Sequence, residues 1–304
     1  HRELVKEPTI RRVEEAMRSL GCQMENTVTV SKETQPLIVL NIPGIENAFY
    51  QEIIRGARVS AKAHGCHLLI HESHLNKGNM LDFCNLLRRV DAAGVILLNR
   101  ISEEALNQIR TIAPLVQCCE YNEHADYPYV SIDDTKAAEI ATEYLLSNGG
   151  SKIALINGPG NFKYARRRQE GFMNALQKAE VMIPKQWIVQ LPEVSYEMAY
   201  AAICRLLNSD SRPNAFFTIS DVFAAAVIRA AKRFHLHVPR DILVVGFDNI
   251  ELSSMTTPSI TTVNQPKFQM GYTACEMLLE LLEEPQEEMK SLILDTELII
   301  REST

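Results

Sequence analysis

Short apolar runs alternate with amphipathic segments along nearly the whole chain from about residue 36. The runs are too short for helices and stop at polar residues or glycine, which favours buried strands. The longer segments between them place their apolar residues on one face, as helices covering a sheet do. The expected strands are Leu37–Ile42, His67–His71, Ala93–Leu98, Leu115–Cys118, Lys152–Ile156, Trp187–Gln190, Asn214–Thr218 and Ile242–Val245. The expected helices include Phe49–His64, Asn79–Val90, Thr135–Asn148, Tyr164–Ala179, Tyr196–Asn208 and Val222–Phe234. This alternation predicts an α/β fold with parallel sheets covered on both faces.

A loose internal repeat divides this pattern into two halves. Residues 36–44 precede a helix that contains Gly56, and the similar residues 152–160 precede a helix that contains Gly171. Two similar lobes are implied, each unable to form a complete binding site alone. Glycines 149 and 150 follow an expected helix, so the chain is expected to cross between the halves within residues 148–151.

Composition and charge favour a cytoplasmic globular protein. The chain has seven cysteines, an odd number with no Cys-x-x-Cys pair, which argues for reduced thiols rather than a disulfide framework. We find no apolar signal core near the start and no run of 18 apolar residues, so we expect neither secretion nor membrane insertion. The formal charge of −7 gives no general attraction to nucleic acid.

Catalytic and metal-binding motifs are missing from the sequence. There is no nucleophile elbow, phosphate-binding loop, dinucleotide fingerprint or zinc-protease motif. Four histidines, at positions 64, 67, 71 and 74, look like a metal tract but straddle a helix end, a strand and a loop without a recurrent ligand spacing. We therefore expect no cofactor, no metal and no enzymatic activity.

The segment from Asn214 to Pro266 carries the most information. A strand-like Ala215–Thr218 leads into Ser220-Asp221 at a helix start, Ile242–Val245 leads into Gly246-Phe-Asp-Asn249, and Thr261–Pro266 follows. These sequence segments, in this order, resemble the effector-binding core of the LacI/GalR family of transcription regulators, and the resemblance extends from about Pro36 to Thr304. The resemblance implies two parallel-sheet lobes of periplasmic-binding-protein type with a ligand cleft between them.

In that family the chain crosses between the lobes three times. Carried over, an N-terminal lobe comprises residues 36–148 and 266–289, and a C-terminal lobe comprises residues 151–264 and 290–304. Residues 1–35 are expected to be the remnant of a DNA-binding headpiece and its linker. Thr9–Gly21 is similar to the last helix of that headpiece, whereas the helix-turn-helix that reads DNA is absent from the sequence.

Two charged residues fall on ligand-binding positions of the family. Asp248 follows a strand, where a carboxylate can hold neighbouring sugar hydroxyls or can form an Asx turn. Arg168 ends a run of three arginines that could equally be a solvated helix start, and its guanidinium fork suits a hydroxyl or an anion. The resemblance favours ligand contact for both.

The remaining candidates leave alternatives open. Either Phe49 or Tyr50 is expected in the pocket, where an aromatic face can stack on a sugar or base, with the other partly buried. Ser220 occupies a pocket-facing position of the family. Asp133 either caps the helix near Thr135 or faces the cleft. Asp221 is interpreted as an N-cap, and Gln265 contacts ligand or satisfies backbone groups between the lobes.

The sequence therefore predicts the sensor core of a transcription regulator. Its expected partners are a small effector, operator DNA reached through a headpiece outside this chain, and a second copy in a homodimer. Residues 246–252, 263–266 and 294–304 look most like the cytidine-repressor branch, which favours a nucleoside or ribose-like effector over a hexose. The alternatives are a sugar-binding protein of an uptake system and, with no catalytic groups to name, a sugar-handling enzyme.

Overall fold

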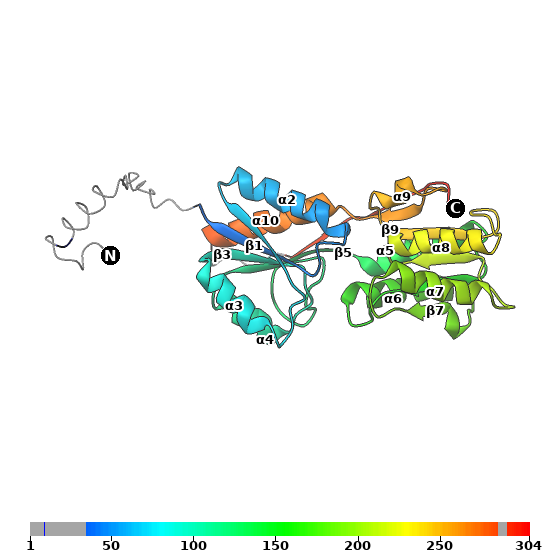
Figure 1. Cartoon of the computed structure of the whole chain (residues 1–304), viewed down its shortest axis with the longest axis horizontal. Coiled ribbons are helices and arrows are strands. Elements are labelled where there is room, and N and C mark those ends of the chain that lie inside the picture. Colours follow the sequence, from blue (N-terminus) through cyan, green and yellow to red (C-terminus); the bar gives the residue numbers. More distant parts are fainter. Residues whose placement is uncertain (1–8, 10–34, 285–290) are drawn as a thin grey trace. The chain divides into compact units, whose positions relative to one another are not determined.

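The computed structural model describes Thr9, residues 35–284 and residues 291–304 (Figure 1). Contacts divide the chain into two units, His1–Gln35 and Pro36–Thr304. Apart from Thr9, the expected headpiece helix and linker lie outside the described residues. The fold below is that of the unit Pro36–Thr304.

Two six-stranded sheets organise the described part of this unit. The first has the order β11-β5-β4-β3-β1-β2 and is parallel throughout. The second has the order β12-β10-β9-β8-β6-β7, with only β12 antiparallel to its neighbour. The α/β fold with two similar parallel-sheet lobes is confirmed.

The first lobe comprises residues 36–132 and the described residues of 267–294. Its strands are β1 (Leu37–Ile42), β2 (His67–Glu72), β3 (Ala92–Leu97), β4 (Leu115–Cys118), β5 (Tyr129–Ile132) and β11 (Leu292–Leu294). Its helices are α2 (Phe49–Ala63), α3 (Met80–Arg89), α4 (Glu103–Arg110) and α10 (Lys267–Glu283). Gly65 ends α2 with φ of +67°, a conformation that glycine adopts without strain.

The second lobe comprises residues 134–264 and 297–304. Its strands are β6 (Ile153–Asn157), β7 (Ile188–Gln190), β8 (Ala215–Thr218), β9 (Leu243–Asp248), β10 (Thr261–Asn264) and β12 (Glu297–Ile299). Its helices are α5 (Asp134–Ser147), α6 (Lys163–Lys178), α7 (Tyr196–Leu207), α8 (Asp221–Arg233) and α9 (Leu252–Met255), with a short 3₁₀ turn, η2 (Lys185–Trp187).

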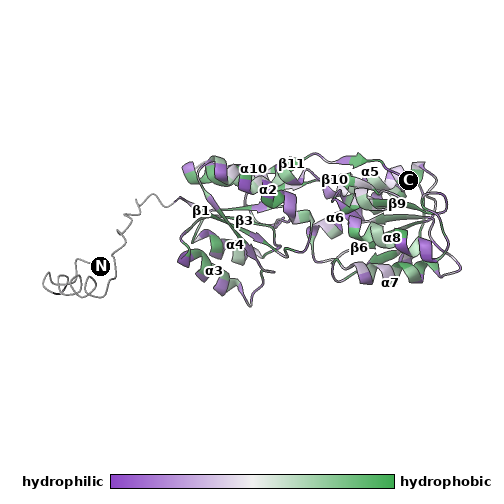
Figure 2. Cartoon of the chain, turned by 45° about the horizontal axis from the view of Figure 1, so that its top comes forward, coloured by the Kyte–Doolittle hydropathy of each residue, from purple (hydrophilic) through white to green (hydrophobic). Residues whose placement is uncertain are grey.

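Burial of the central strands explains their continuous apolar sequences. All five residues of β6 and all four of β8 are buried, because helices cover both faces of a parallel sheet. In Figure 2 the strands are predominantly hydrophobic, whereas the helices carry both hydrophobic and hydrophilic residues. The short β11 and β12 were not expected from the sequence, since three-residue edge strands are too short for a periodic signal.

The two repeat glycines lie where helices of the same lobe approach closely. A Cβ on Gly56 of α2 would stand 2.0 Å from the Phe268 carbonyl oxygen of α10, and one on Gly171 of α6 would stand 2.0 Å from the Thr135 carbonyl oxygen of α5. Only glycine allows backbones to pack at this distance. Helix α10 therefore has the place in the first lobe that α5 has in the second.

The lobe boundaries differ from those expected at two crossings. Helix α5 packs on α6 and touches β8, β9, β10 and β12, so the first crossing lies near Asp133 and the expectation of 148–151 is wrong. The glycines at 149 and 150 serve the turn between α5 and β6. Strand β11 pairs with β5 of the first sheet, which moves the third crossing from about 290 to residues 295–296. The second crossing lies between Asn264 and Lys267.

Candidate ligand-binding site

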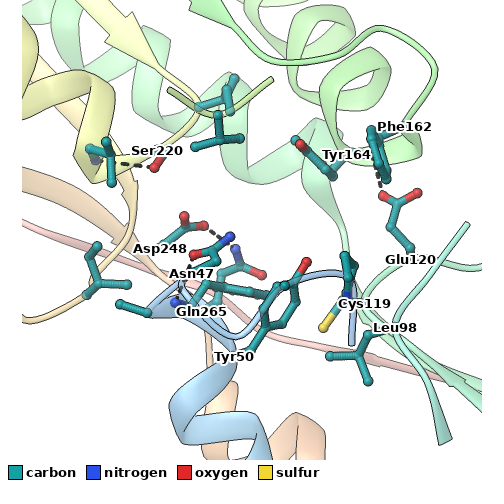
Figure 3. A pocket seen from close by; sticks show the side chains of 18 of the residues that line it. Asn47, Tyr50, Leu98, Cys119, Glu120, Phe162, Tyr164, Ser220, Asp248 and Gln265 are labelled. Atoms are coloured by element: carbon teal, nitrogen blue, oxygen red, sulfur yellow. Dashed lines mark hydrogen bonds between the residues drawn. The ribbon is translucent and has the colours of Figure 1, made fainter. Parts of the chain in front are cut away.

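A cavity of about 880 Å³ lies between the carboxyl ends of the two sheets (Figure 3). Polar strand ends of parallel sheets converge on such edges, which is where open α/β sheets bind ligands. The volume falls within the range typical of small-molecule sites. The first lobe lines the cavity with Pro43, Gly44, residues 46–50, His74, Leu98, Cys119, Glu120, Ser131, Ile132 and Met270. The second lobe and the second crossing line it with Asp134, Pro159, Phe162, Tyr164, Arg168, 192–194, Ile219, Ser220, Val222, Asp248, Ile250, Leu252 and Gln265.

Asp248 ends β9 with its carboxylate at the cavity wall. Its Oδ1 accepts a hydrogen bond of 2.7 Å from Gln265 Nε2, and the Lys267 ammonium donates to its backbone oxygen. Its φ of +100° is unusual for a residue other than glycine and aims the side chain away from the strand direction. Burial raises the pKa of Asp248, against the opposing charges of Arg168 and Lys267. None of the hydrogen bonds among the described residues engages its Oδ2.

Arg168 is buried beside a second carboxylate, Asp134. Its Nε donates to Asp134 Oδ1 at 2.9 Å, its Nη1 donates to the Ile219 carbonyl at 2.7 Å, and Nη1 lies 3.6 Å from Asp248 Oδ1. The guanidinium carbon lies 3.5 Å from the ring centre of Phe247. Arg168 thereby links the start of α5, the end of β9 and the loop that follows β8.

Asp134 has two cationic partners. Lys163 Nζ donates to its Oδ2 at 2.7 Å and also to Ser131 Oγ at 3.3 Å. Burial acts to raise the pKa of Asp134, but the charges of Arg168 and Lys163 outweigh it and hold the pKa below its usual value. The carboxylate is therefore ionised, and the two cations share its charge.

Glu120 follows β4 and reaches across the cavity to the start of α6. Its Oε2 accepts from the Lys163 N–H at 3.0 Å and its Oε1 from the Tyr164 N–H at 2.9 Å. Burial raises the pKa of Glu120, against the opposing charge of Lys163. Figure 3 shows Glu120 with Phe162 and Tyr164 at one end of the cavity, and Asp248 with Gln265 at the other.

Aromatic side chains lie between these polar ends. Phe49 and Tyr50 both line the cavity and are both partly buried, with their rings edge to face at 5.4 Å, so the expectation that only one of them faces it is wrong. Phe162 and Tyr164 stack at 5.5 Å. Burial raises the pKa of Tyr50 well above its ordinary value, so its hydroxyl stays neutral and can donate.

The structure brings six of the seven sequence candidates together. Those lining the cavity are Phe49, Tyr50, Arg168, Ser220, Asp248 and Gln265. Asp133 is the exception: it is exposed, and its Oδ1 accepts from the Lys136 N–H as the N-cap of α5. Asp134, the next residue, faces the cavity instead.

Ser220 takes the cap role that the sequence suggested for Asp221. Ser220 is the N-cap of α8, where its Oγ accepts from the Val222 N–H at 3.2 Å, and it also lines the cavity. Asp221 is fully buried within the first turn and accepts from the Ile250 N–H and from Thr262 Oγ1. The interpretation of Asp221 as an N-cap is wrong, because its side chain points toward β10 rather than back over its own helix.

Sequence reasoning missed Glu120, Asp134 and Lys163. Glu120 stands two residues after the apolar strand Leu115–Cys118, so the same strand-end rule that found Asp248 would have found it. Asp134 could not be separated from its neighbour Asp133 without knowing where α5 begins. Lys163 gave no signal, because a single lysine before a helix is ordinarily solvated.

The histidine tract is not a metal site in the described structure. His71 Nδ1 lies 3.0 Å from Asn41 Nδ2, a bond within the first sheet. Among the described residues, no group of three His, Cys, Asp or Glu side chains could hold a metal ion. Of the helices described, none is long and apolar enough to cross a membrane.

A family model, curated relatives and a solved structure agree on the kind of protein that this chain resembles. The family model of a periplasmic binding protein-like domain matches residues 142–304. The chain is 33% identical over 304 residues to the HTH-type transcriptional repressor CytR of Escherichia coli strain K12, covering 99% of this chain and 89% of that protein. It is 30% identical over 286 residues to the ribose operon repressor of the same strain, covering 92% and 86%. A LacI family regulator from Enterococcus faecium, solved with bound ribose, matches with a TM-score of 0.78 at 25% identity and covers 88% of this chain and 98% of that one.

Proposed function

Because the chain belongs to the LacI/GalR family of transcription regulators, we propose that residues 36–304 are its effector-binding core and that the cavity takes a ribose-bearing molecule, a nucleoside or free ribose. Its relatives are repressors rather than enzymes. The ribose operon repressor and the Enterococcus faecium regulator with bound ribose are both similar to this chain, which supports a ribose ring over a hexose.

The observation that carries the proposal is the carboxylate of Asp248 in the cavity wall. Gln265 holds its Oδ1, while Oδ2 is open to accept from a ligand within the described structure. A carboxylate oxygen can accept from two neighbouring hydroxyls, as the cis-diol of ribose presents them. The aromatic rings of Tyr50 and Phe162 offer faces for the less polar part of the ligand.

Effector binding would act on DNA through the relative position of the lobes. The cavity walls come from both lobes, so a ligand contacting both stabilises the closed arrangement by its differential affinity for it. In a homodimer, that closure would change how two DNA-binding headpieces are spaced against operator half-sites. We therefore assign the chain to cytoplasmic transcription control with operator DNA and a second copy as partners.

A sugar-binding protein of an uptake system is the second candidate, since it would share the fold. It would bind the same class of ligand but would not respond to operator DNA. Reading the coding sequence upstream of His1 separates the two, because a helix-turn-helix supports the regulator and a signal peptide supports transport.

Calorimetry with ribose and with cytidine tests the ligand assignment. Asp248→Asn should weaken binding by about 1.5–3 kcal/mol, the value of hydrogen bonds to a charged group. Asn is isosteric and tolerates the positive φ, so the variant should fold. Asp210→Asn, an exposed substitution after α7, is the matched control. Equal affinities for both variants would remove Asp248 from the binding site.

A further inference from the structure

The cavity wall carries far more negative than positive charge. Its lining includes one guanidinium, that of Arg168, and the carboxylates of Glu46, Glu120, Asp134, Glu193 and Asp248. Three of these carboxylates are buried, where screening by salt is weak. Glu46 and Glu193 are exposed while lining the cavity, so they stand where it opens to solvent.

The positive groups near the cavity are already engaged by oxygens of the protein. Arg168 lies 2.9 Å from one Asp134 oxygen and 3.6 Å from Asp248. Lys163 lies 2.7 Å from the other Asp134 oxygen. Lys267 donates to the backbone oxygens of Asp248 and Asn249. A ligand anion would have to compete with these buried carboxylates and carbonyls for each cation.

The helix N-termini at the cavity are also occupied. Exposed N–H groups at helix starts are the ordinary phosphate site of α/β proteins. Here the Lys163 and Tyr164 N–H groups of α6 bind the Glu120 carboxylate, the Val222 N–H of α8 binds Ser220 Oγ, and the Phe49 N–H of α2 binds Asn47 Oδ1 at 3.0 Å. At α6 the protein supplies its own anion.

We infer that this pocket discriminates against anionic ligands: it accepts uncharged or cationic ribosides and rejects their phosphorylated forms, with Glu120 beside Phe162 and Tyr164, and Glu46 and Glu193 at the opening, as specificity determinants. The inference rests on the proposed ribose-bearing effector and defines its class.

Matched ligand pairs test this inference. Affinities for cytidine and cytidine 5′-monophosphate, and for ribose and ribose 5-phosphate, are measured by calorimetry on the whole chain at low and physiological salt. We expect each phosphorylated ligand to bind on the order of 100-fold more weakly than its partner, since like-charge contacts at buried sites are costly. The ratio should shrink as salt screens Glu46 and Glu193.

A double variant tests whether Glu46 and Glu193 cause this discrimination. Glu46→Gln with Glu193→Gln removes two exposed charges. It should reduce the ratio of the two dissociation constants, phosphorylated over unphosphorylated ligand, about threefold to tenfold, the scale of two exposed charge interactions. Glu103→Gln on α4, exposed and outside the cavity lining, should leave the ratio unchanged.

The possible failures are distinguishable. If a phosphorylated ligand binds as tightly as its partner, or alone, the inference is overturned and the site remains a ligand pocket. If the double variant leaves the ratio unchanged, the assignment to the two glutamates at the opening is wrong. If neither member of either pair binds, the proposed ribose-bearing effector falls, and the inference falls with it.

Discussion

Glu120 in the first lobe caps the helix that begins at Lys163 in the second. Its carboxylate binds the Lys163 and Tyr164 N–H groups, and three residues further on Glu123 pairs with Arg167 Nε at 3.0 Å and Arg166 Nη2 at 3.2 Å. The loop after β4 therefore ties the lobes together next to the cavity. The arginine run has two roles, since Arg166 and Arg167 hold this loop while Arg168 lies inside.

Glu120→Ala should release the start of α6. Loss of an N-cap acceptor costs about 0.5–2 kcal/mol. Because Glu120 and α6 belong to different lobes, this cost destabilises the closed arrangement of the lobes. We expect a larger radius of gyration in X-ray scattering without ligand, and recovery of the compact value when ligand is added. Asp126→Ala is the control, because this exposed aspartate of the same loop makes none of the hydrogen bonds to the second lobe in the described structure. Identical scattering for both variants would show that Glu120 does not hold the lobes.

Two adjacent aspartates should differ sharply in stability. Asp134→Ala leaves Lys163 and Arg168 buried without their shared carboxylate, which should cost about 3–5 kcal/mol. Asp133→Ala removes only the cap of α5, at about 0.5–2 kcal/mol. Urea denaturation of the two variants provides the comparison. A milder effect at Asp134 than at Asp133 would contradict the buried network.

Asp221 should make stability fall as the pH rises. Burial, together with the charge of Asp248, raises the pKa of Asp221 to about 8, whereas an unfolded aspartate titrates near 3.9. Between these values the folded chain binds the proton more strongly, so this contribution is fully present below about pH 4 and is lost as the pH rises through about 8.

Asp221→Asn removes that titration. The amide oxygen can still accept from the Ile250 N–H, and the amide NH₂ can donate to the Thr262 hydroxyl, which itself donates to Asp221 in the parent. The variant should gain stability relative to the parent between pH 5 and pH 9, measured as the free energy of unfolding in urea. A difference that is constant over this range would mean that Asp221 is ionised throughout.

Gly56→Ala should force α2 away from α10. The added methyl carbon would meet the Phe268 carbonyl at 2.0 Å, so helix backbones rather than a side chain must shift. Overpacking of this kind costs about 1–3 kcal/mol or more. Gly160→Ala is the comparison, since its Cβ would find only Gln190 at 3.4 Å. Thermal unfolding should separate the two, and similar melting temperatures would rule out the close approach.

The sequence predicts most of the fold because apolar periodicity is a local signal. Strands such as Leu37–Ile42 and Leu115–Cys118 were located to the residue, since Pro36, Pro43 and Pro114 bound these apolar runs. The crossings were misplaced because the lobe on which α5 packs depends on the Gly171 contact, which sequence does not display. The same limit applies to Asp133 and Asp134. A shift of one residue in the start of α5 decides which of the two caps the helix and which faces the cavity.

The first lobe is completed by a helix that follows most of the second lobe in the sequence, and this order affects how the protein folds on the ribosome. Helix α10 and strand β11 complete the first lobe, yet they are translated after nearly all of the second. A nascent chain that has emerged only as far as β5 lacks the helix that covers Gly56 and leaves apolar surface open to solvent. The second lobe likewise waits for β12 and for Ser303, whose backbone oxygen accepts from the Val244 N–H. Such long-range closure slows folding, and both lobes reach their native form only after β11, β12 and Ser303 have been translated.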